Sequence, residues 1–509
     1  MATPSTNPLR EGMRLTRTAE PCAVIIFGAS GDLTKRKLVP ALYHLTQDRL
    51  LPSEFAVVGV ARRETSDEQF RQNMRDALVE LGGEQLDDSA WESFAKGLYY
   101  VTGDFDNPET YRRLDEKLQL VDRERGTSGN RVFYLSTSPS AFTQIVDLLG
   151  DAKLVHPEGD SWARVIIEKP IGHSLESAVA LNEAVGTVLR EDQIYRIDHY
   201  LGKETVQNLL AFRFGNGIFE PLWNRNYIDN IQITNAEAVG VEGRGGYYEG
   251  TGVVRDMIQN HVFQVLSLVA MEPPINMTAT AVRDEKIKVM EAIQPITHDM
   301  VPDVAVRGQY GAGHVGGKVV PGYREEDGVT AESPTETFAA FKLTFDNWRW
   351  GGVPFYIRSG KRMARRITEI AIYFKEVPHR LFPSQQLEPN CLIVRVQPNE
   401  GITLRFNAKV PGQTTTIRAV NMDFRYGASF GARLAEAYER LLLDCILGDS
   451  TLYARRDMTE RGWEIVTPVL DRWAEEAPGS EFPNYEAGSW GPKASDDMLE
   501  RDGRRWRRL

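Results

Sequence analysis

The sequence predicts a Rossmann-like, doubly wound α/β domain followed by an α+β domain with a large, mainly antiparallel sheet and helices on one face. Up to about residue 200, short β-rich runs alternate with amphipathic stretches of helical period, which is typical of parallel strands joined by crossover helices. Beyond about residue 225, strands with apolar/polar alternation follow one another with little but turns between them. We therefore expect domains at 21–200 and 201–490, a flexible N-terminal tail at 1–20 and a basic C-terminal tail at 491–509.

The first domain is expected to hold five strands in a parallel sheet. They are predicted at CAVIIF (22–27), FAVVGVAR (55–62), GLYYVTG (97–103), RVFYLST (131–137) and RVIIEKP (164–170). Lys169 then lies at the end of the last of these strands. Doubly wound sheets bind ligands in the crevice at the carboxyl ends of their strands, so we expect the ligand there.

The second domain is expected to combine a wide sheet with a few long helices. Strands are predicted at 227–243, 336–346, 353–360, 368–377, 391–398 and 401–410. Helices are predicted near 249–271, 280–293, 431–447 and 459–474. The segment 308–333 is rich in glycine and polar residues, which predicts a long surface loop.

Composition and charge exclude several classes of function. With 42% hydrophobic and 26% charged residues, the chain resembles an ordinary globular protein. No apolar run approaches the ~20 residues that a membrane span needs, and the N-terminal segment lacks the apolar core of a signal peptide. A net charge of −11 argues against nonspecific nucleic-acid binding. We expect neither a membrane nor a nucleic-acid partner.

Three scattered cysteines indicate a reduced, cytoplasmic compartment. Cys22, Cys391 and Cys445 form no CxxC pair, which argues against a disulfide framework or a zinc site. The histidines and cysteines do not stand at ligand spacings along the chain, so we expect no metal. The C-terminal RDGRRWRRL could be a basic arm for a polyanion, but a solvated tail is the favoured interpretation.

A glycine turn after the first strand is the candidate nucleotide site. In FGASGDLTKRKL (27–38), Gly28 and Gly31 let the backbone turn tightly into a helix whose free N–H groups can face a pyrophosphate. The spacing matches the G-x-G-x-x-G fingerprint only in part, and a turn without a ligand is the alternative. Its place after the first strand of an alternating unit favours dinucleotide binding. The predicted cofactor-binding residues of the turn are Gly28, Ala29, Ser30, Gly31, Asp32, Leu33, Thr34 and Lys35.

The residues after the second strand predict which dinucleotide is bound. NAD-type sites place an acid there to hold the ribose hydroxyls, whereas NADP sites need an arginine. This chain has Arg62 at that position, and Arg63 and Arg36 could assist, because guanidinium groups match phosphate geometry. Glu64 stands close enough to keep NAD as the weaker alternative. An arginine that serves only solubility is the other interpretation.

Four segments together resemble one family. GASGDLTKRKLVPALY, EKPIG, RIDHYLGKE and GRGGYYEGTGVVRDMIQNH are similar to the glucose-6-phosphate dehydrogenases, and the resemblance runs from about Cys22 to Trp473. It implies a Rossmann-like coenzyme domain beside a β+α domain. It also implies oxidation of D-glucose 6-phosphate to 6-phospho-D-glucono-1,5-lactone with NADP⁺, the first step of the oxidative pentose phosphate pathway. A homodimer or homotetramer is expected on the same ground.

The resemblance implies a proton-accepting pair and a phosphate site. His261 matches the family's general base and Asp198 the carboxylate that orients it. His199 and Lys203 match the phosphate binders, and Tyr200 is expected to join them. The i, i+4 spacing of His199 and Lys203 would place both side chains on one helix face. Without the family pattern, a satisfied core histidine would be the favoured interpretation of His261, and Lys203 could simply pair with Glu204 on a solvated face.

The remaining substrate contacts also follow from the resemblance. Glu237, Asp256 and Lys361 match residues that bind the sugar, and Lys169 is placed to touch both cofactor and substrate. The family pattern further implies a cis or strained bond before Pro170.

Two rival interpretations remain. The sugar and inositol dehydrogenases share the Rossmann domain, the E-K-P strand end and the sheet, but usually act on unphosphorylated polyols. A nucleotide-sensing protein would keep the fold without turnover. A phosphate cluster argues against the first, and a complete acid–base pair against the second.

Overall fold

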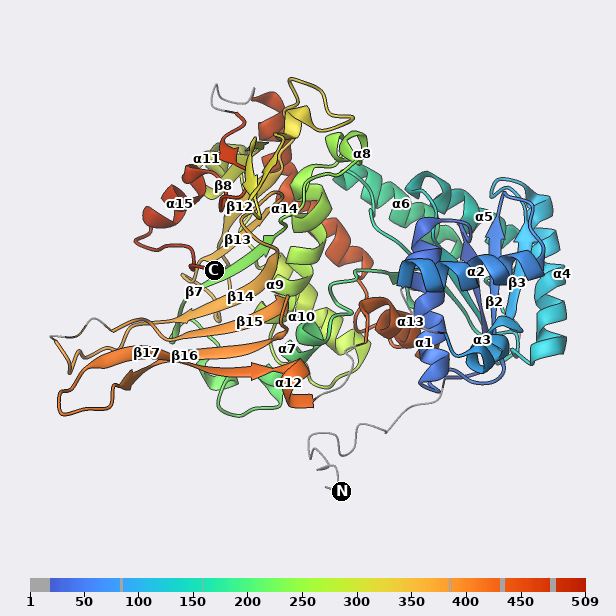
Figure 1. Cartoon of the computed structure of the whole chain (residues 1–509), viewed down its shortest axis with the longest axis horizontal. Coiled ribbons are helices and arrows are strands. Elements are labelled where there is room, and N and C mark those ends of the chain that lie inside the picture. The colour runs from blue at the N-terminus through green and yellow to red at the C-terminus, as the bar shows by residue number, and fades with distance from the viewer. Residues whose placement is uncertain are drawn as a thin grey trace.

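The computed structural model describes residues 19–82, 86–157, 159–383, 385, 387–430, 435–476 and 482–509. Two lobes stand side by side, and each contains one main sheet (Figure 1). The predicted flexible tail at 1–20 lies outside the described residues except for its last two positions.

The first lobe is a six-stranded parallel sheet with the strand order β3-β2-β1-β4-β5-β6. This is the order of a Rossmann fold, so the predicted fold class is confirmed. The strands are β1 (Cys22–Phe27), β2 (Phe55–Ala61), β3 (Leu98–Thr102), β4 (Arg131–Leu135), β5 (Ala163–Ile167) and β6 (Ile194–Arg196). The placement of Lys169 after the last strand is wrong, because it follows β5 and the short β6 comes later.

Helices cover both faces of this sheet, which explains why its strands are apolar throughout. Alternate residues of β1 enter two different cores: Val24 and Ile26 pack in one, and Ile25 and Phe27 in the other. The first core includes side chains of α1 (Val39–Gln47), α2 (Asp67–Gly82) and α3 (Asp88–Ala95). The second includes those of α4 (Pro108–Arg125) and α5 (Phe142–Asp151), and α6 (Leu175–Val188) contributes to both.

The second lobe is built on an eight-stranded sheet with the order β17-β16-β15-β14-β7-β13-β12-β8. Neighbouring strands are antiparallel except for β7 and β13, which run parallel. The prediction of a mainly antiparallel sheet is therefore confirmed. The strands are β7 (Ile228–Ala236), β8 (Ala305–Gly308), β12 (Phe338–Leu343), β13 (Phe355–Gly360), β14 (Ile367–Phe374), β15 (Cys391–Gln397), β16 (Gly401–Lys409) and β17 (Ile417–Arg425).

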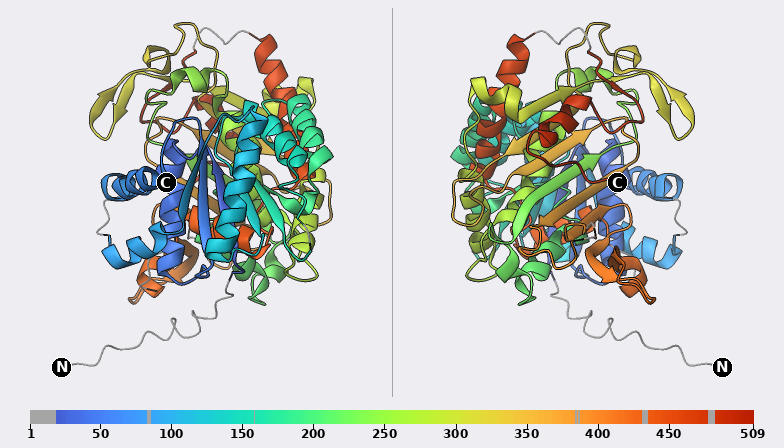
Figure 2. Two further views of the ribbon diagram at one scale, coloured as in Figure 1. Left: turned by 90° about the vertical axis from the view of Figure 1, so that its right-hand side faces the viewer. Right: turned by 90° about the vertical axis from the view of Figure 1, so that its left-hand side faces the viewer.

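Long helices lie between the two sheets (Figures 1 and 2). They are α7 (Glu204–Phe214), a π-helical segment (Val254–Val262) that continues into α9 (Phe263–Ala270), α10 (Ala279–Glu291), α13 (Ala437–Leu447) and α14 (Arg456–Glu475). The core that begins on one face of the first sheet continues through these helices to the second sheet. The lobes thus share packed apolar surface, which fixes the functional groups of one lobe against those of the other. Residues 431–434 of the predicted helix 431–447 lie outside the described residues.

The segment 308–333 is more structured than predicted. It contains β9 (Tyr310–Gly311) and a hairpin of β10 (Gly313–Val315) and β11 (Lys318–Val320). Tyr310 and Tyr323 are completely buried. The surface-loop prediction fails here because strands of two or three residues leave almost no periodicity in a glycine-rich sequence.

The C-terminal residues dock onto the second sheet, so the interpretation as a solvated tail is wrong. Helix α15 (Lys493–Glu500) precedes Trp506, which is only 8% exposed and donates its indole N–H to Ser495. Arg504 forms an ion pair with Asp229 of β7. The arginines therefore flank Trp506, a buried aromatic side chain that anchors the segment to the sheet. The arginine-rich composition gave no indication of this anchor.

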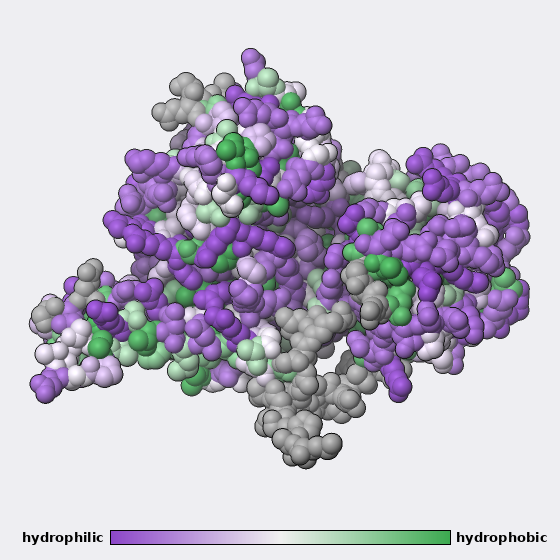
Figure 3. All heavy atoms as spheres, in the orientation of Figure 1, coloured by the Kyte–Doolittle hydropathy of each residue, from purple (hydrophilic) through white to green (hydrophobic). Residues whose placement is uncertain are grey.

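Polar residues cover most of the surface seen in Figure 3. All three cysteines are buried with free thiols. Among the described helices, none has the length and apolarity to cross a bilayer.

Candidate active site

The glycine turn is forced by a close approach between two strands. Gly28 has φ +86°, and a Cβ there would lie 2.0 Å from the carbonyl oxygen of Ser136 after β4. The Gly31 N–H closes the turn onto the Gly28 carbonyl at 2.9 Å, and the Thr34 hydroxyl donates to the same oxygen at 3.2 Å. The helix that leads into α1 begins at Asp32. Its N-terminus therefore faces the carboxyl ends of the strands, where an anion is favoured.

A cavity of about 650 Å³ lies over this turn, and part of the predicted set lines it. Of the predicted residues, Gly28, Ser30, Gly31 and Arg62 line the cavity. Ala29 and Thr34 are instead fully buried beneath the turn. The other predicted residues, Asp32, Leu33 and Lys35, are not among the residues that line it, nor is Arg36, which pairs with Asp32.

Further residues complete the cavity wall. Arg63, expected above to assist Arg62, lines it, and so do Asp104, Asp106, Thr137 and Gln144, which were not predicted. Asp104 and Thr137 follow β3 and β4, so the rule that ligands bind at carboxyl strand ends would have found them. Glu64 lines a separate surface hollow instead.

Asp198 and His261 meet although 63 residues separate them. Asp198 follows β6, and His261 lies near the end of the π-helical segment Val254–Val262. Asp198 Oδ1 lies 2.6 Å from His261 Nδ1, and the two side chains are 5% and 1% exposed. The bond is therefore shielded from water, which strengthens it.

The electrostatics of this pair fix the proton arrangement. Burial raises the pKa of Asp198, but the charge of His261 and the bond to it outweigh burial and lower that pKa to about 2. Burial lowers the pKa of His261, against the Asp198 carboxylate, which raises it. At neutral pH the carboxylate is thus ionised and only accepts, so Nδ1 carries the proton and Nε2 keeps its lone pair.

Lys169 points at that lone pair. Its Nζ lies 3.0 Å from His261 Nε2 and 3.2 Å from Asp256 Oδ1. The bond between Lys169 and Pro170 is cis, as the family resemblance implied. An ammonium at Nε2 opposes a positive charge on the imidazole, which is consistent with its action in lowering the pKa of His261.

Glu237, Asp256 and Lys361 form a second charged group beside Lys169. Lys361 Nζ lies 2.7 Å from Glu237 Oε2 and 3.9 Å from Asp256 Oδ2. Glu237 follows β7 and Lys361 follows β13, and because these strands are parallel their carboxyl ends lie side by side. The Glu237 N–H bonds the carbonyl of Gly360 at 2.9 Å, which fixes the register of the two ends.

His199 and Lys203 lie in a turn, so the argument from a shared helix face is wrong. Helix α7 begins only at Glu204, after a turn that follows β6. The His199 ring lies 4.5 Å from the His261 ring. Lys203 Nζ lies 5.0 Å from the Tyr200 ring, so both cationic candidates still flank Tyr200. Burial lowers the pKa values of His199 and Lys203.

Two residues missed in the sequence extend this basic cluster. Gln397, at the end of β15, accepts hydrogen bonds from Lys203 Nζ at 2.6 Å and from Arg366 at 3.2 Å. Arg366 is exposed and immediately precedes β14. Nothing in a single sequence relates these strand-end positions to Lys203, because the pairing of β14 with β15 has to be known first.

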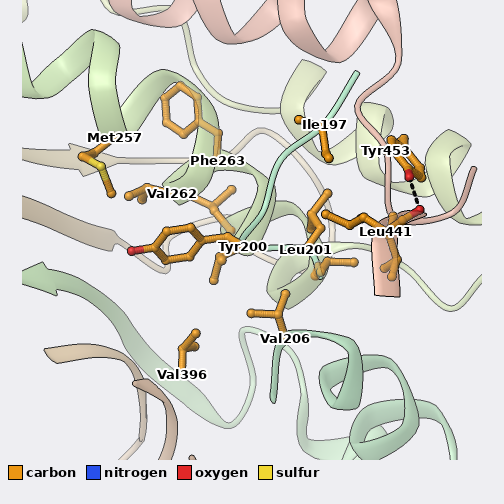
Figure 4. Packing of buried hydrophobic residues seen from close by; sticks show 14 of the residues in the cluster. Ile197, Tyr200, Leu201, Val206, Met257, Val262, Phe263, Val396, Leu441 and Tyr453 are labelled. Carbon is orange, nitrogen blue, oxygen red and sulfur yellow. Dashed lines mark hydrogen bonds between the residues drawn. The ribbon is translucent and has the colours of Figure 1, made fainter. Parts of the chain in front are cut away.

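Tyr200 connects the base to the cluster. Its ring stacks on the His261 ring with centroids 4.5 Å apart and an interplanar angle of 23°. Its hydroxyl accepts a hydrogen bond from Asn235 Nδ2 at 2.9 Å. Figure 4 shows Tyr200 among apolar side chains that include Val262 and Val396, so the ring position is set by the core.

Residues 25–208 match the family described as glucose-6-phosphate dehydrogenase, NAD binding domain, and residues 210–507 match glucose-6-phosphate dehydrogenase, C-terminal domain. The chain belongs to the glucose-6-phosphate dehydrogenase family. A glucose-6-phosphate 1-dehydrogenase of Chlamydia pneumoniae is 48% identical over 99% of this chain and 100% of its own length. One of Bacillus subtilis is 45% identical, over 96% and 99%.

Solved structures of the glucose-6-phosphate dehydrogenase family share the whole architecture. A glucose-6-phosphate dehydrogenase in complex with glucose 6-phosphate has a TM-score of 0.88 at 36% identity, covering 97% of this chain and 100% of that one. The enzyme of Mycobacterium avium has a TM-score of 0.80 at 36% identity, over 96% and 99%. Because the chain belongs to this family, the rival interpretation as a sugar or inositol dehydrogenase is excluded.

One expectation about metal ligands needs correction. The side chains of Asp198, His199 and His261 bring one ligand atom each to within 4.8 Å of one another, although the sequence suggested no such cluster. Folding, not spacing along the chain, assembles this group. Both ring nitrogens of His261 are already engaged, by Asp198 and Lys169. A carboxylate on Nδ1 of a histidine is typical of a general base. The expectation that this chain needs no metal stays a prediction.

Proposed function

We propose that the carboxylate–imidazole pair of Asp198 and His261 is the proton acceptor with which this chain oxidises D-glucose 6-phosphate. The product is 6-phospho-D-glucono-1,5-lactone, and the reaction is the first step of the oxidative pentose phosphate pathway. The observation that carries the proposal is the arrangement of Asp198 Oδ1, protonated Nδ1 and a lone pair on Nε2 that faces the charged group at Lys169.

The reaction needs a proton acceptor at the anomeric hydroxyl. As the C1–O bond becomes a carbonyl, the hydroxyl proton passes to His261 Nε2, and the ionised Asp198 stabilises the imidazolium that forms. NADP⁺, held at the glycine turn, would supply the acceptor for the hydride that leaves C1. Lys169 lies where its ammonium can shift from Nε2 to the substrate oxygen and keep its link to Asp256.

The substrate is held at both ends. We assign the phosphate to His199, Lys203 and Tyr200, which lie beside the base. Glu237, Asp256 and Lys361 bind the sugar hydroxyls, because carboxylates accept and the ammonium donates. Glucose without phosphate loses the first set of contacts, so its kcat/KM should be lower by orders of magnitude.

NADP is the proposed cofactor, with NAD as the weaker alternative. The cavity over the glycine turn suits a dinucleotide, since Gly28, Ser30 and Gly31 line it at the start of a helix and Arg62 and Arg63 line the same cavity. Glu64 lines another hollow, which leaves the arginines as the side chains after β2 that can meet a ribose substituent.

The two regions divide the work in this proposal. Residues 21–200 bind NADP and contribute Lys169, His199 and Tyr200 to the substrate site. Residues 201–490 supply the remaining substrate contacts and mediate assembly into a homodimer or homotetramer. The buried, free thiols support a cytoplasmic location. Size-exclusion chromatography with light scattering measures the assembly, and a monomer at micromolar concentration would contradict that part.

The direct test follows absorbance at the reduced-nicotinamide band. Glucose 6-phosphate with NADP⁺ should give rapid reduction, and glucose at equal concentration almost none. Equal kcat/KM for the two sugars would remove the phosphate assignment, and equal kcat/KM for NAD⁺ and NADP⁺ would remove the cofactor preference.

A further inference from the structure

We propose that a buried water beside Asp198 links its carboxylate to Gln264, and through Gln264 to Lys286, so that Gln264 and Lys286 are positioning residues for the base. This inference deepens the proposed function and rests on it. Neither residue is a hydrogen-bond partner of the imidazole, whose nitrogens pair with Asp198 and Lys169.

A small cavity borders the catalytic pair. Its volume is about 30 Å³, and its lining includes Asp198, His261 and Gln264 together with Lys169 and Gln259. A space of roughly 10–15 Å³ is enough for one water when polar partners surround it. The lining supplies such partners, so the cavity suits one or two waters rather than an apolar void.

One of the two carboxylate oxygens of Asp198 lacks a hydrogen-bond donor within the described part of the chain. Asp198 Oδ1 accepts from His261 Nδ1 and from the Tyr200 N–H. Asp198 Oδ2 is buried and has no hydrogen-bond partner within the described part of the chain. Buried carboxylate oxygens are normally satisfied, and a donor in the adjacent cavity would satisfy this one.

Lys286 fixes which end of the Gln264 amide faces that cavity. Lys286 comes from α10, is 0% exposed, and donates from Nζ to Gln264 Oε1 at 2.7 Å. No carboxylate of the described residues forms an ion pair with it. Because the amide oxygen of Gln264 accepts from Lys286, the amide NH₂ is left to donate elsewhere. The NH₂ can then donate to a water that donates to Asp198 Oδ2.

The charge of Lys286 also acts on the pair. Burial lowers the pKa of Lys286 to about 7, the Asp198 carboxylate raises it, and Arg283 on the same helix lowers it. The coupling is mutual, so a protonated Lys286 stabilises the carboxylate and opposes the imidazolium. It therefore helps to keep His261 neutral and ready to accept a proton.

The test uses Lys286→Met, Gln264→Met and the double variant in the full-length chain. Each single change should lower kcat roughly tenfold, a size typical of coupling between contacting residues. KM for glucose 6-phosphate should stay within about twofold, because the substrate contacts are intact. In Lys286→Met the acidic limb of the kcat/KM profile should move up by roughly half a pH unit or more, since a charge that opposes imidazolium is gone.

Two controls separate this role from a loss of folding. Lys288→Met changes an exposed lysine of the same helix and should leave the pH profile unchanged. The double variant replaces both buried partners with apolar groups of similar size, so it should melt close to the wild-type Tm, and its kcat should be no lower than that of the worse single variant.

A high-resolution crystal structure of the full chain tests the water independently of activity. An ordered water within hydrogen-bond distance of both Asp198 Oδ2 and Gln264 Nε2 is expected. A dry cavity, or an acidic limb that stays in place in folded Lys286→Met, would overturn the inference. If the wild-type chain itself failed to reduce NADP⁺, the proposed function would fail while the water could still be present.

Discussion

Asp198→Asn is the change that probes the proton arrangement of the base most finely. The substitution keeps the size of the side chain but gives it an NH₂ group in place of one oxygen. The new amide can adopt two orientations. In one, its oxygen takes the place of Asp198 Oδ1 and accepts from the Tyr200 N–H and from His261 Nδ1. In the other, the amide is turned, and its NH₂ donates to His261 Nδ1. In the turned state Nδ1 must carry the lone pair, and the proton moves to Nε2.

The size of the effect follows from the geometry. A proton on Nε2 faces Lys169 Nζ at 3.0 Å and occupies the site that has to accept the hydroxyl proton. Loss of the negative charge also removes the stabilisation of the imidazolium. Comparable loss of tautomer control in an Asp–His pair costs roughly 10⁴-fold in kcat. We expect a fall of roughly 10³–10⁴-fold here, which corresponds to about 4–5.5 kcal/mol of transition-state stabilisation.

The assay is steady-state NADP⁺ reduction with glucose 6-phosphate varied, together with fluorescence titration of NADPH. KM for the sugar phosphate and the NADPH Kd should change little. Asp299→Asn, at a fully exposed aspartate, is the matched control and should retain wild-type kcat. A kcat within tenfold of wild type in Asp198→Asn would refute the assignment of Asp198 as the carboxylate that orients and stabilises the His261 imidazole.

The other predictions concern the two anionic ligands. Lys203→Ala should raise KM for glucose 6-phosphate by roughly tenfold or more with little change in kcat, while KM for free glucose stays the same; equal effects on both sugars would contradict the phosphate role. Arg62→Ala should lower kcat/KM for NADP⁺ by roughly 10–100-fold and spare NAD⁺, and a parallel loss with both cofactors would argue for a folding defect. His199 is neutral when free because burial lowers its pKa, and a phosphate dianion raises the pKa again. Calorimetry at pH ~7.5, where the phosphate is already a dianion, should therefore show proton uptake on binding that His199→Asn abolishes; uptake that persists in the variant must come from another group.

Much of the fold could be predicted because local patterns determined it. The alternation of apolar runs and helical periods identified the parallel sheet, and the glycine turn identified its first crossover. Strand β6 was missed because three residues carry too little periodicity. The C-terminal segment was misjudged because its five arginines outweighed Trp506, whose burial depends on a sheet face formed elsewhere.

The site depended more on long-range contacts. The nearness of Asp198 to His261 was implied by family resemblance alone, since no local rule relates the turn after β6 to the π-helical segment. Glu237 and Lys361 meet because they follow two parallel strands, β7 and β13. The sequence predicted a mainly antiparallel sheet, in which this parallel strand pair is the exception. His199 and Lys203 both lie beside the Tyr200 ring, but they do so from a turn and not from a helix.

The most direct test of the account is the single-turnover rate of His261→Asn with saturating NADP⁺ and glucose 6-phosphate. Removing the proton acceptor should slow hydride transfer by roughly 10²–10⁴-fold while the Kd values of both ligands stay within a few-fold of wild type. A wild-type rate of hydride transfer in a folded His261→Asn protein would show that the base lies elsewhere.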